Sequence, residues 1–304
     1  MTNTAAGHKT KSAHDIHLGA APLHFKRILF ATDFSPQASA AFKTAVRLSQ
    51  NYGSMLYLAH VVSPMLYAPN GGVVAPALQQ AEIESAHEKL GHHITRMPEP
   101  GAIKYQQIVT CGMAKELIPA IVKENHIDLL AMGSHGRDGV SKLALGSVAE
   151  AALRHVHCPV LVCGPHCRRT YHPFKSILLA TDLSLESLRS AQFASALSEE
   201  FHSQLTIAHV IRNQPAREDR DQGFAKIKEL VPEDTGLQKH IRFSIHSGDP
   251  ASELLGVAER TNADLIVMGV HETGFAADHA PWSTISSVIR EARCPVMAVQ
   301  PHFG

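Results

Sequence analysis

Short apolar runs alternate with longer amphipathic stretches along most of the chain. The runs RILFATD (27–33) and MLYLAHVV (55–62) are almost continuously apolar, as expected of parallel strands buried on both faces. Between them, PQASAAFKTAVRLSQNYG (36–53) places apolar residues at helical spacing and closes on glycine. Ser35 and Pro36 suit a helix start, because the hydroxyl can accept an unpaired amide and proline fits the first helical position. The pattern predicts a strand, a helix and a second strand.

The same alternation continues to about residue 163. It predicts helices over 76–96, 114–126 and 147–156 and strands over 104–112, 127–133 and 159–163. Strands that alternate with helices form parallel sheets with right-handed crossovers and helices on both faces. This part of the chain is therefore expected to be a doubly wound, five-stranded α/β domain.

The pattern then repeats. FKRILFATDFS (25–35) returns as FKSILLATDLS (174–184), an offset of 149 residues, and LYLAHVV returns as LTIAHVI at the same offset. CGMAKELIPAIVKENHIDLLAMGSH (111–135) corresponds to SGDPASELLGVAERTNADLIVMGVH (247–271), an offset of 136 residues. The first copy therefore carries 13 extra residues after its second strand. Self-similarity of this kind predicts two tandem domains of one fold.

The expected organisation follows from these limits. We expect a disordered N-terminal tail at 1–24, a first domain at 25–164 and a second domain at 174–301. Residues 165–173 between the domains contain proline and charge without periodicity and are expected to form a short linker. The two fifth strands offer exposed edges. The sequence therefore suggests an intramolecular pseudo-dimer of the two domains, and it leaves open a homodimer of chains.

The amino-acid composition limits the classes of binding partner and the cellular compartments that are expected. Lys plus Arg equals Asp plus Glu at 28 each, so no charge excess favours nucleic acid or an anionic membrane surface. No run reaches the roughly 18 apolar residues of a membrane span, and the N-terminus lacks a signal-peptide pattern. The five cysteines are an odd number spread through a long chain, which is typical of reduced thiols. We expect a cytoplasmic protein whose partner is small or another protein.

Metal binding has weak support in the sequence. The tail histidines include His14 and His17, but no further ligands accompany them at zinc-site spacing. CGPHC offers Cys163, His166 and Cys167, which are three of the four ligands that a structural zinc ion requires. A redox or metal role for this loop and a purely structural role both stay open.

The candidate chemistry lies in MGSHGRDGVSKLALGS (132–147), directly after the fourth predicted strand. In open parallel sheets a ligand binds beyond the carboxyl ends of the strands, where the strand order reverses. Gly133 and Gly136 lack the Cβ atoms that would keep phosphates away from backbone amides. Gly146 and Ser147 open the last helix, whose free amides and dipole favour an anion. The two segments together predict a phosphate site. Ser147 with Glu150 also forms a capping box, and a cap and an anion site are compatible.

These residues resemble a known family. Gly133, two residues, Gly136, nine residues, Gly146 and Ser147 match the ATP-binding pattern of the universal stress protein family in every fixed position. The resemblance extends over two copies, from about residue 25 to residue 301. It implies the family's Rossmann-like fold, similar to the adenine nucleotide alpha hydrolases, and a nucleotide between the ends of strands one and four.

The resemblance also implies the site residues. The phosphates and ribose would meet the fixed glycines and Ser147, the adenosine end would meet the strand-one Asp and its preceding small residues, and the adenine edge would meet the backbone of a strand-two valine. The nucleotide-binding residues implied in this way, with two loop residues added, are Ala31, Thr32, Asp33, Val61, Met132, Gly133, His135, Gly136, Arg137, Gly146, Ser147 and Val148.

Several of these residues have alternative roles. Asp33 is repeated as Asp182, and such an Asp between a strand and a helix often only bonds nearby amides. His135 can approach a phosphate or face solvent. Arg137, with Ser141 and Lys142, can close over a triphosphate as charge-assisted donors or simply occupy an exposed loop.

The second copy departs from the pattern. Glu272 stands at the position of Gly136 and Trp282 at that of Gly146, while Ser283 is kept. A carboxylate against a polyphosphate costs roughly 1–4 kcal/mol at surface-like dielectric, and tryptophan fills space where bare backbone is required. We therefore expect ATP in the first domain only.

Three functions remain open at this point. The favoured one is an ATP-binding stress-response protein that acts as a nucleotide-dependent switch or sensor, with Mg²⁺ as a candidate companion of ATP held by Asp33 and the Ser147 hydroxyl. The second is a nucleotide-independent interaction scaffold, and the third is a weak ATPase. The sequence has no Walker A or G-x-G-x-x-G motif after a first strand, and it shows no clear base for hydrolysis other than His135. Binding is therefore favoured over catalysis.

Overall fold

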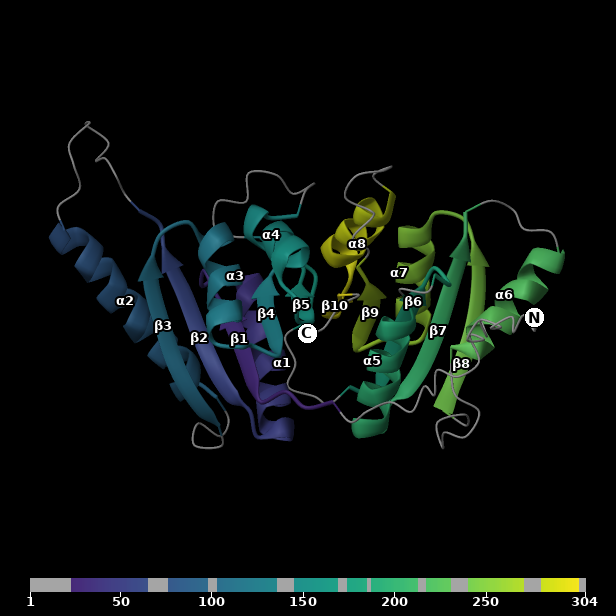
Figure 1. The fold of residues 1–304 in the computed structure, drawn as a ribbon, viewed down its shortest axis with the longest axis horizontal. Helices are drawn as coiled ribbons and strands as arrows, with labels where there is room; N and C mark the ends of the chain where they lie inside the picture. The colour runs from purple at the N-terminus through teal and green to yellow at the C-terminus, as the bar shows by residue number, and fades with distance from the viewer. Residues whose placement is uncertain are drawn as a thin grey trace, which may run out of the picture.

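The computed structural model describes residues 23–64, 76–97, 103–135, 145–168, 174–184, 187–212, 217–230, 240–270 and 280–300. Within these ranges strands and helices alternate in both halves of the chain (Figure 1). The doubly wound α/β fold predicted from the sequence is confirmed.

In the residues that the structure describes, the first half has five strands and four helices at or close to their predicted positions. The elements are β1 (Arg27–Ala31), α1 (Pro36–Tyr52), β2 (Met55–Val62), α2 (Pro76–Thr95), β3 (Lys104–Cys111), α3 (Ala114–Glu124), β4 (Leu129–Gly133), α4 (Ser147–His155) and β5 (Val160–Cys163).

The second half repeats this order. Its elements are β6 (Ser176–Thr181), α5 (Ser187–Glu200), β7 (Gln204–Ile211), α6 (Arg217–Glu229), β8 (Ile241–Ser247), α7 (Pro250–Arg260), β9 (Leu265–Gly269), α8 (Ala280–Glu291) and β10 (Val296–Val299).

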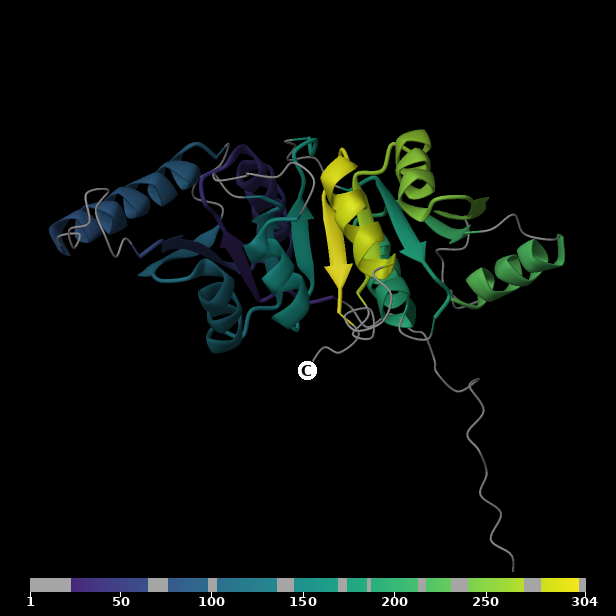
Figure 2. The same ribbon diagram turned by 90° about the horizontal axis from the view of Figure 1, so that it is seen from above.

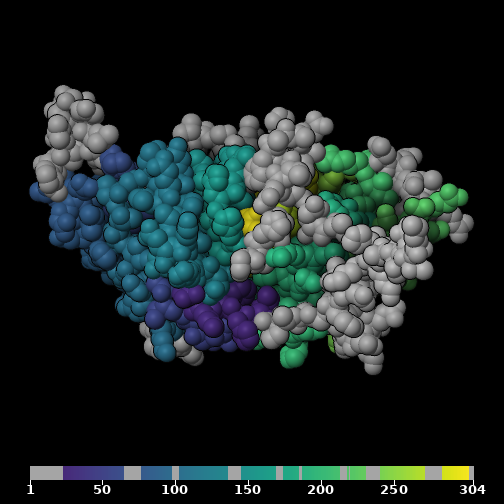
Figure 3. All heavy atoms as spheres, viewed as in Figure 1, coloured from purple at the N-terminus to yellow at the C-terminus, as the bar shows by residue number. Residues whose placement is uncertain are grey.

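The ten strands in the described part of the chain form one sheet in the order β3-β2-β1-β4-β5-β10-β9-β6-β7-β8. The strands within each half are parallel, whereas β5 and β10 pair antiparallel at the centre through residues 160–162 and 296–298. Figure 1 shows β5 and β10 next to each other at the centre of the molecule, and Figure 3 shows the two halves side by side. In each half the strand order reverses between the first and fourth strands, which creates the crevice where such sheets bind ligands.

Hydrophobic clusters cover both faces of the sheet. One cluster contains Ile28 and Phe30 of β1 together with residues of α1, α2, α5 and α6. The other cluster contains Leu29 and Ala31 of β1 together with residues of α3, α4, α7 and α8. Figure 2 shows helices on both sides of the sheet. Residues of one strand thus alternate between two buried faces, which explains why the strands are apolar throughout.

The predicted boundaries of α1 are confirmed. The Ala38 amide donates to Ser35 Oγ at 3.2 Å, and Pro36 is the first helical residue. Gly53 ends the helix in the left-handed conformation, with φ of 63°, and its amide donates to the Ser49 carbonyl. Glycine adopts this conformation at little cost.

The seam between the halves has two contacts at equivalent positions. The residue after β5, Gly164, lies so close to α8 that a Cβ there would come within 1.9 Å of the Ile289 carbonyl oxygen. The residue after β10, Gln300, instead donates its side-chain amide to the Leu153 carbonyl of α4 at 2.8 Å, in a buried position. One half therefore meets its neighbour with bare backbone and the other with a hydrogen bond.

The start of the segment between the two halves contacts the second half. The Arg168 amide donates to the Arg293 carbonyl at 2.9 Å, and Gly164 packs on α8 as described above. The expected linker thus begins as a segment packed on the second half. Cys158 and Cys294 occupy equivalent positions before β5 and β10, and each is 7% exposed and part of the hydrophobic core. In the part of the chain that the structure describes, no helix is long and apolar enough to span a membrane.

Candidate functional site

The first domain has its candidate site at the carboxyl ends of β1 and β4. The two strands are adjacent and parallel, and their pairing ends with Ala31 opposite Met132. Both side chains are buried. The chain leaves β1 toward α1 and leaves β4 toward α4, so the starts of two helices flank the crevice.

A tight turn follows β1. The Phe34 amide donates to Thr32 Oγ1 at 2.9 Å, and the Ser35 amide donates to Asp33 Oδ1 at 3.0 Å. Phe34 has φ of 65°, and the turn leads directly into the Ser35 cap of α1. Asp33 therefore shapes this turn, as its structural alternative requires, and it is half-buried at the rim of the crevice.

The second domain contains the same turn. The Leu183 amide donates to Thr181 Oγ1 at 3.0 Å, the Ser184 amide donates to Asp182 Oδ1 at 3.0 Å, and Leu183 has φ of 64°. The recurrence of Asp at this position is thus explained by local structure alone. A role of Asp33 toward a ligand must come from its position beside β4 and α4.

The end of β4 and the start of α4 are in direct contact. The Gly146 amide donates to the Ser134 carbonyl at 2.9 Å. A Cβ at Gly146 would come within 2.7 Å of that oxygen and 3.2 Å of His135 Cα. The two segments, which the intervening loop separates in the sequence, therefore meet at one point, and this approach requires glycine at position 146.

Gly133 has a different structural reason from the one inferred from the sequence. A Cβ at this position would come within 2.8 Å of the Ala38 amide nitrogen and 3.1 Å of Gln37 Cβ. Gly133 is therefore needed so that β4 can pack against the first turn of α1. The equivalent Gly269 has ordinary space, with its nearest contact, Ser190 Oγ, at 3.4 Å.

The capping box inferred for Ser147 and Glu150 is wrong. Gly146 is the N-cap of α4, it provides no side-chain cap, and Ser147 is the first helical residue and is exposed. The Glu150 carboxylate instead accepts from Arg154 at 2.8 Å. The contact of Gly146 with Ser134 fixes where the helix begins, one residue earlier than a cap at Ser147 would require. The first amides of α4 thus have no capping side chain, and the positive end of the helix dipole lies there.

Two side chains of the loop after β4 have defined neighbours. His135 is half-buried, with its Nδ1 atom 2.9 Å from Ser134 Oγ, and its carbonyl accepts from Ser35 Oγ at 3.5 Å. The latter bond links the β4 loop to the start of α1. Gly136, Arg137, Ser141 and Lys142 lie outside the described residues, as does Glu272.

The sequence reasoning missed His60. Its Nδ1 atom donates to the Thr32 carbonyl at 2.7 Å, and the equivalent His209 makes the same bond to Thr181 at 2.9 Å. His60 also packs on Phe34, with ring centroids 4.6 Å apart. This side chain holds the β1 turn against β2. The signal was present in the repeated AH dipeptide of the two second strands.

Val61 lies one strand further from β4. The pairing of β1 with β2 ends at Ala31 and Ala59, and the Thr32 amide still donates to the Ala59 carbonyl. The Val62 carbonyl, by contrast, accepts from Gly112 on the β3 side. Because strand backbone groups alternate in direction, the amide and carbonyl of Val61 face the β1 side, beyond the last paired residue of β1. They point toward the crevice.

The described part of the predicted site is thus brought together by three segments. The β1 turn, the β4 loop and the start of α4 are linked by the contacts above, with Val61 at the edge. The predicted residues in these segments are Ala31, Thr32, Asp33, Val61, Met132, Gly133, His135, Gly146, Ser147 and Val148.

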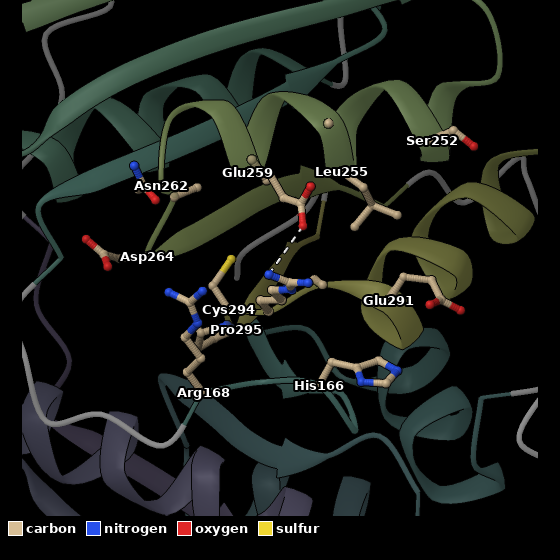
Figure 4. Close-up of a pocket in the computed structure, with 15 residues that line it drawn as sticks. His166, Arg168, Ser252, Leu255, Glu259, Asn262, Asp264, Glu291, Cys294 and Pro295 are labelled. Atoms are coloured by element: carbon tan, nitrogen blue, oxygen red, sulfur yellow. Dashed lines mark ion pairs between the residues drawn. The ribbon is translucent and has the colours of Figure 1, made fainter.

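A separate cavity of about 800 Å³ lies in the second half (Figure 4). It is lined by one side of α7 from Ser252 to Glu259, the end of α8, the residues just before β9 and β10, and His166 and Arg168. Two of its carboxylates have partners, because Glu259 pairs with Arg293 at 3.5 Å and Asp264 accepts the amides of Lys175 and Ser176 at 2.8 and 3.1 Å. The cavity lies at the opposite ends of these strands from the crevice.

The cysteine loop after β5 shows free thiols. All five cysteines are unpaired with one another, and burial raises the pKa of the Cys163 thiol well above its usual range. Across the described segments, His, Cys, Asp and Glu side chains nowhere gather in groups of three or more that could hold a metal ion.

The fold and the crevice define a class: a tandem pair of doubly wound α/β domains, each with its candidate site where the first and fourth strands end. The model of the Universal stress protein family matches residues 24–164 and 173–300. The chain belongs to the universal stress protein family.

Individual relatives agree with this assignment. A universal stress protein of Methanocaldococcus jannaschii is 30% identical over 142 residues, which cover 45% of this chain and 81% of that protein. A universal stress protein A homologue of Coxiella burnetii is 30% identical over 144 residues, which cover 46% of this chain and 96% of the homologue. The crystal structure of a universal stress protein from Archaeoglobus fulgidus is 22% identical, with a TM-score of 0.70, and the match covers 92% of this chain and all (100%) of that one. This last likeness shows that the fold is shared across both halves.

Proposed function

We propose that the first domain binds an adenine nucleotide, with ATP as the ligand, and that the chain uses this binding as a nucleotide-dependent switch or sensor in the stress response. One observation carries the proposal: the Gly146 amide bonds the Ser134 carbonyl at 2.9 Å. This contact sets the uncapped start of α4 beside the β4 loop. Backbone amides at a helix start, together with the dipole, favour a phosphate.

The residues fit a nucleotide in a definite orientation. The amides of Ser147 and Val148 would meet the phosphates, with Gly136 and Arg137 expected to contribute from the loop. Asp33 at the β1 turn would meet the ribose and adenosine end, and the backbone of Val61 would read the adenine edge. Asp33 and the Ser147 hydroxyl are the groups that would hold Mg²⁺ with the phosphates.

The second domain is proposed not to bind ATP. Ser147 is the first residue of α4, so its amide is free, whereas the equivalent Ser283 is the fourth residue of α8. Ser283 therefore lies deeper in its helix than Ser147 does, and further from the positive end of the helix dipole. This difference adds to the substitution of glycine by Trp282.

The arrangement of the two halves bears on how the domains assemble. We propose that the chain is a pseudo-dimer within itself, built from domains at 25–164 and 174–301 on either side of the linker at 165–173, with residues 1–24 as a tail. The antiparallel pairing of β5 with β10 supports this proposal. A homodimer of two such chains and a cytoplasmic location complete it, and the free state of all five cysteines supports the location.

Calorimetric titration of the full chain with ATP, with and without Mg²⁺, tests the proposal. We expect one nucleotide per chain and stabilisation by about 2.7 kcal/mol at a hundred times the dissociation constant. Two nucleotides per chain would refute the restriction to the first domain. No binding at millimolar ATP would refute the proposal and favour a nucleotide-independent scaffold, and phosphate release at saturating ATP would add ATPase activity.

A further inference from the structure

A cluster of polar side chains lies on the edge strand β8 of the second domain. Ser244 Oγ is 2.5 Å from His246 Nε2, and His246 Nδ1 is 3.5 Å from Glu253 Oε2 on α7. Serine, histidine and carboxylate thus follow one another in the order of a nucleophile, a base and a group that orients the base.

The first domain provides an internal comparison. The equivalent positions there hold Ile108, Thr110 and Leu117. The equivalence is structural as well, because Ile108 pairs with Ala59 as Ser244 pairs with Ala208. The second domain thus has side chains that can transfer or hold a proton at all three positions, and His246 contacts both of the others.

The local structure explains why these side chains meet. Ser244 and His246 are two residues apart on one strand, so both project from the same face of the sheet. Gly248 follows with φ of 140° and turns the chain into α7. The first turn of α7 then carries Glu253 back over His246, with a Glu253 oxygen 3.4 Å from the position of a Cβ at Gly248.

The cluster is reachable from solvent. The side chains of His246 and Glu253 are 23% and 34% exposed, and Ser244 is half-buried. Beside them on the same face of the sheet, Val210 of β7 is half-buried and Ala208 is fully buried. The accessible apolar surface next to the cluster is therefore small, which suits a short acyl chain better than a long one.

The protonation states suit a base. Burial is the main cause that lowers the pKa of His246, and the positive charge of Arg260 lowers it further, while Glu253 acts in the opposite direction. The imidazole is therefore neutral at pH 7. With its Nδ1 proton toward the Glu253 carboxylate, its Nε2 lone pair faces the Ser244 hydroxyl.

We propose that Ser244, His246 and Glu253 form an acyl-transfer site that hydrolyses short-chain carboxylic esters. Ser244 Oγ attacks the ester carbonyl and its proton passes to His246 Nε2. The C–O bond to the alcohol breaks, the alcohol leaves with that proton, and an acyl-serine remains. Water then attacks the acyl-serine, gives a proton to His246, and releases the carboxylic acid while Ser244 regains its proton.

Arg242 supplies positive charge for the oxyanion that forms at the carbonyl. It lies two residues before Ser244, on the same face of β8, and is exposed. Two residues along a strand span roughly 7 Å, a distance that an arginine side chain covers. This site is independent of the nucleotide crevice in the first domain.

The test uses the full chain and p-nitrophenyl acetate. We expect release of p-nitrophenolate and an acetyl group on Ser244 when the reaction is quenched early and mapped by mass spectrometry. The Ser244→Ala variant should lose the activity, and His246→Gln should reduce it by roughly 100-fold, the contribution of a general base. The Glu253→Gln variant should lower the rate and alter its pH profile without preventing acetylation.

The matched control is Ser247→Ala, which removes a hydroxyl from the opposite face of the same strand and should leave the rate unchanged. Far-ultraviolet circular dichroism of each variant confirms that the domain is folded. Acetylation of lysines or of other histidines in place of Ser244, or a rate unchanged in folded Ser244→Ala, would overturn the proposal.

Discussion

The replacement Ser147→Glu separates the stability of α4 from its affinity for a phosphate. Ser147 is exposed in the first turn of α4, directly after a cap residue without a side chain. A carboxylate there interacts favourably with the helix dipole and should stabilise the free protein by about 0.3–1 kcal/mol. The same carboxylate should repel a bound polyphosphate. The two effects therefore have opposite signs.

The magnitude of the repulsion follows from where the introduced carboxylate would lie. A phosphate on the amides of Ser147 and Val148 would be roughly 5 Å from this carboxylate, a separation of about one helical turn. At this exposed position the effective dielectric constant lies between that of water and that of a protein surface, so the repulsion is about 1–3 kcal/mol. This corresponds to a rise in the dissociation constant of roughly 5- to 150-fold.

Titration calorimetry with ATP and thermal unfolding of the free protein measure the two effects. The Ser147→Gln variant controls for size without charge, and Ser283→Glu places the same charge in the second domain, where the equivalent amide lies inside α8. In titrations without Mg²⁺, where the Ser147 hydroxyl has no metal ion to hold, both controls should bind ATP within about threefold of the unmodified chain. Affinity retained by Ser147→Glu, or lost equally in Ser147→Gln, would refute the assignment of the start of α4 to the phosphates.

Three further outcomes are expected. Asp33→Asn should weaken ATP binding by roughly tenfold or more, because one hydrogen bond to a charged group is lost. Asp182→Asn changes the equivalent turn of the second domain and should leave ATP binding unchanged. Equal effects of the two variants in calorimetry would show that Asp33 has a structural role only. Gln300→Leu should lower the free energy of unfolding in urea by about 1–3 kcal/mol, because it leaves a buried carbonyl of α4 without its donor, and no change would contradict the importance of that bond. Burial is the main cause that lowers the pKa of His93 in the folded protein, and the charge of Arg96 lowers it further. As the pH falls below about 6.5, the unfolded chain therefore binds a proton at this residue before the folded chain does. The free energy of unfolding should be highest above this pH and should decrease below it. His93→Gln should flatten this dependence in thermal unfolding, the exposed His92→Gln should not, and an equally steep curve in both would assign the loss to other groups.

The fold was predictable because each element carries its own local signals. Ser35, Pro36 and Gly53 fix both ends of α1 through hydrogen bonding and backbone geometry that depend on neighbouring residues only. The elements of the second half could then be predicted from the sequence similarity between the two halves. Doubly wound order followed from the alternation of buried strands with amphipathic helices.

The site was predictable only in part, because its details depend on contacts between distant segments. Gly133 is required by the approach of α1, and Gly146 by the approach of the Ser134 carbonyl, and neither distance can be read from a motif. The same approach starts α4 one residue earlier than a cap at Ser147 would require. The polar cluster around His246 was missed since Glu253 belongs to another element and meets β8 only in the folded chain.

The unlike contacts at the central seam make the two halves no longer interchangeable. If two copies of the first half met through their fifth strands, glycine would occupy both positions, and neither Leu153 carbonyl would receive an amide from a glutamine. If two copies of the second half met, a glutamine would stand on each side where one side has room only for bare backbone. Each half therefore fits the other half of the chain better than it would fit a second copy of itself.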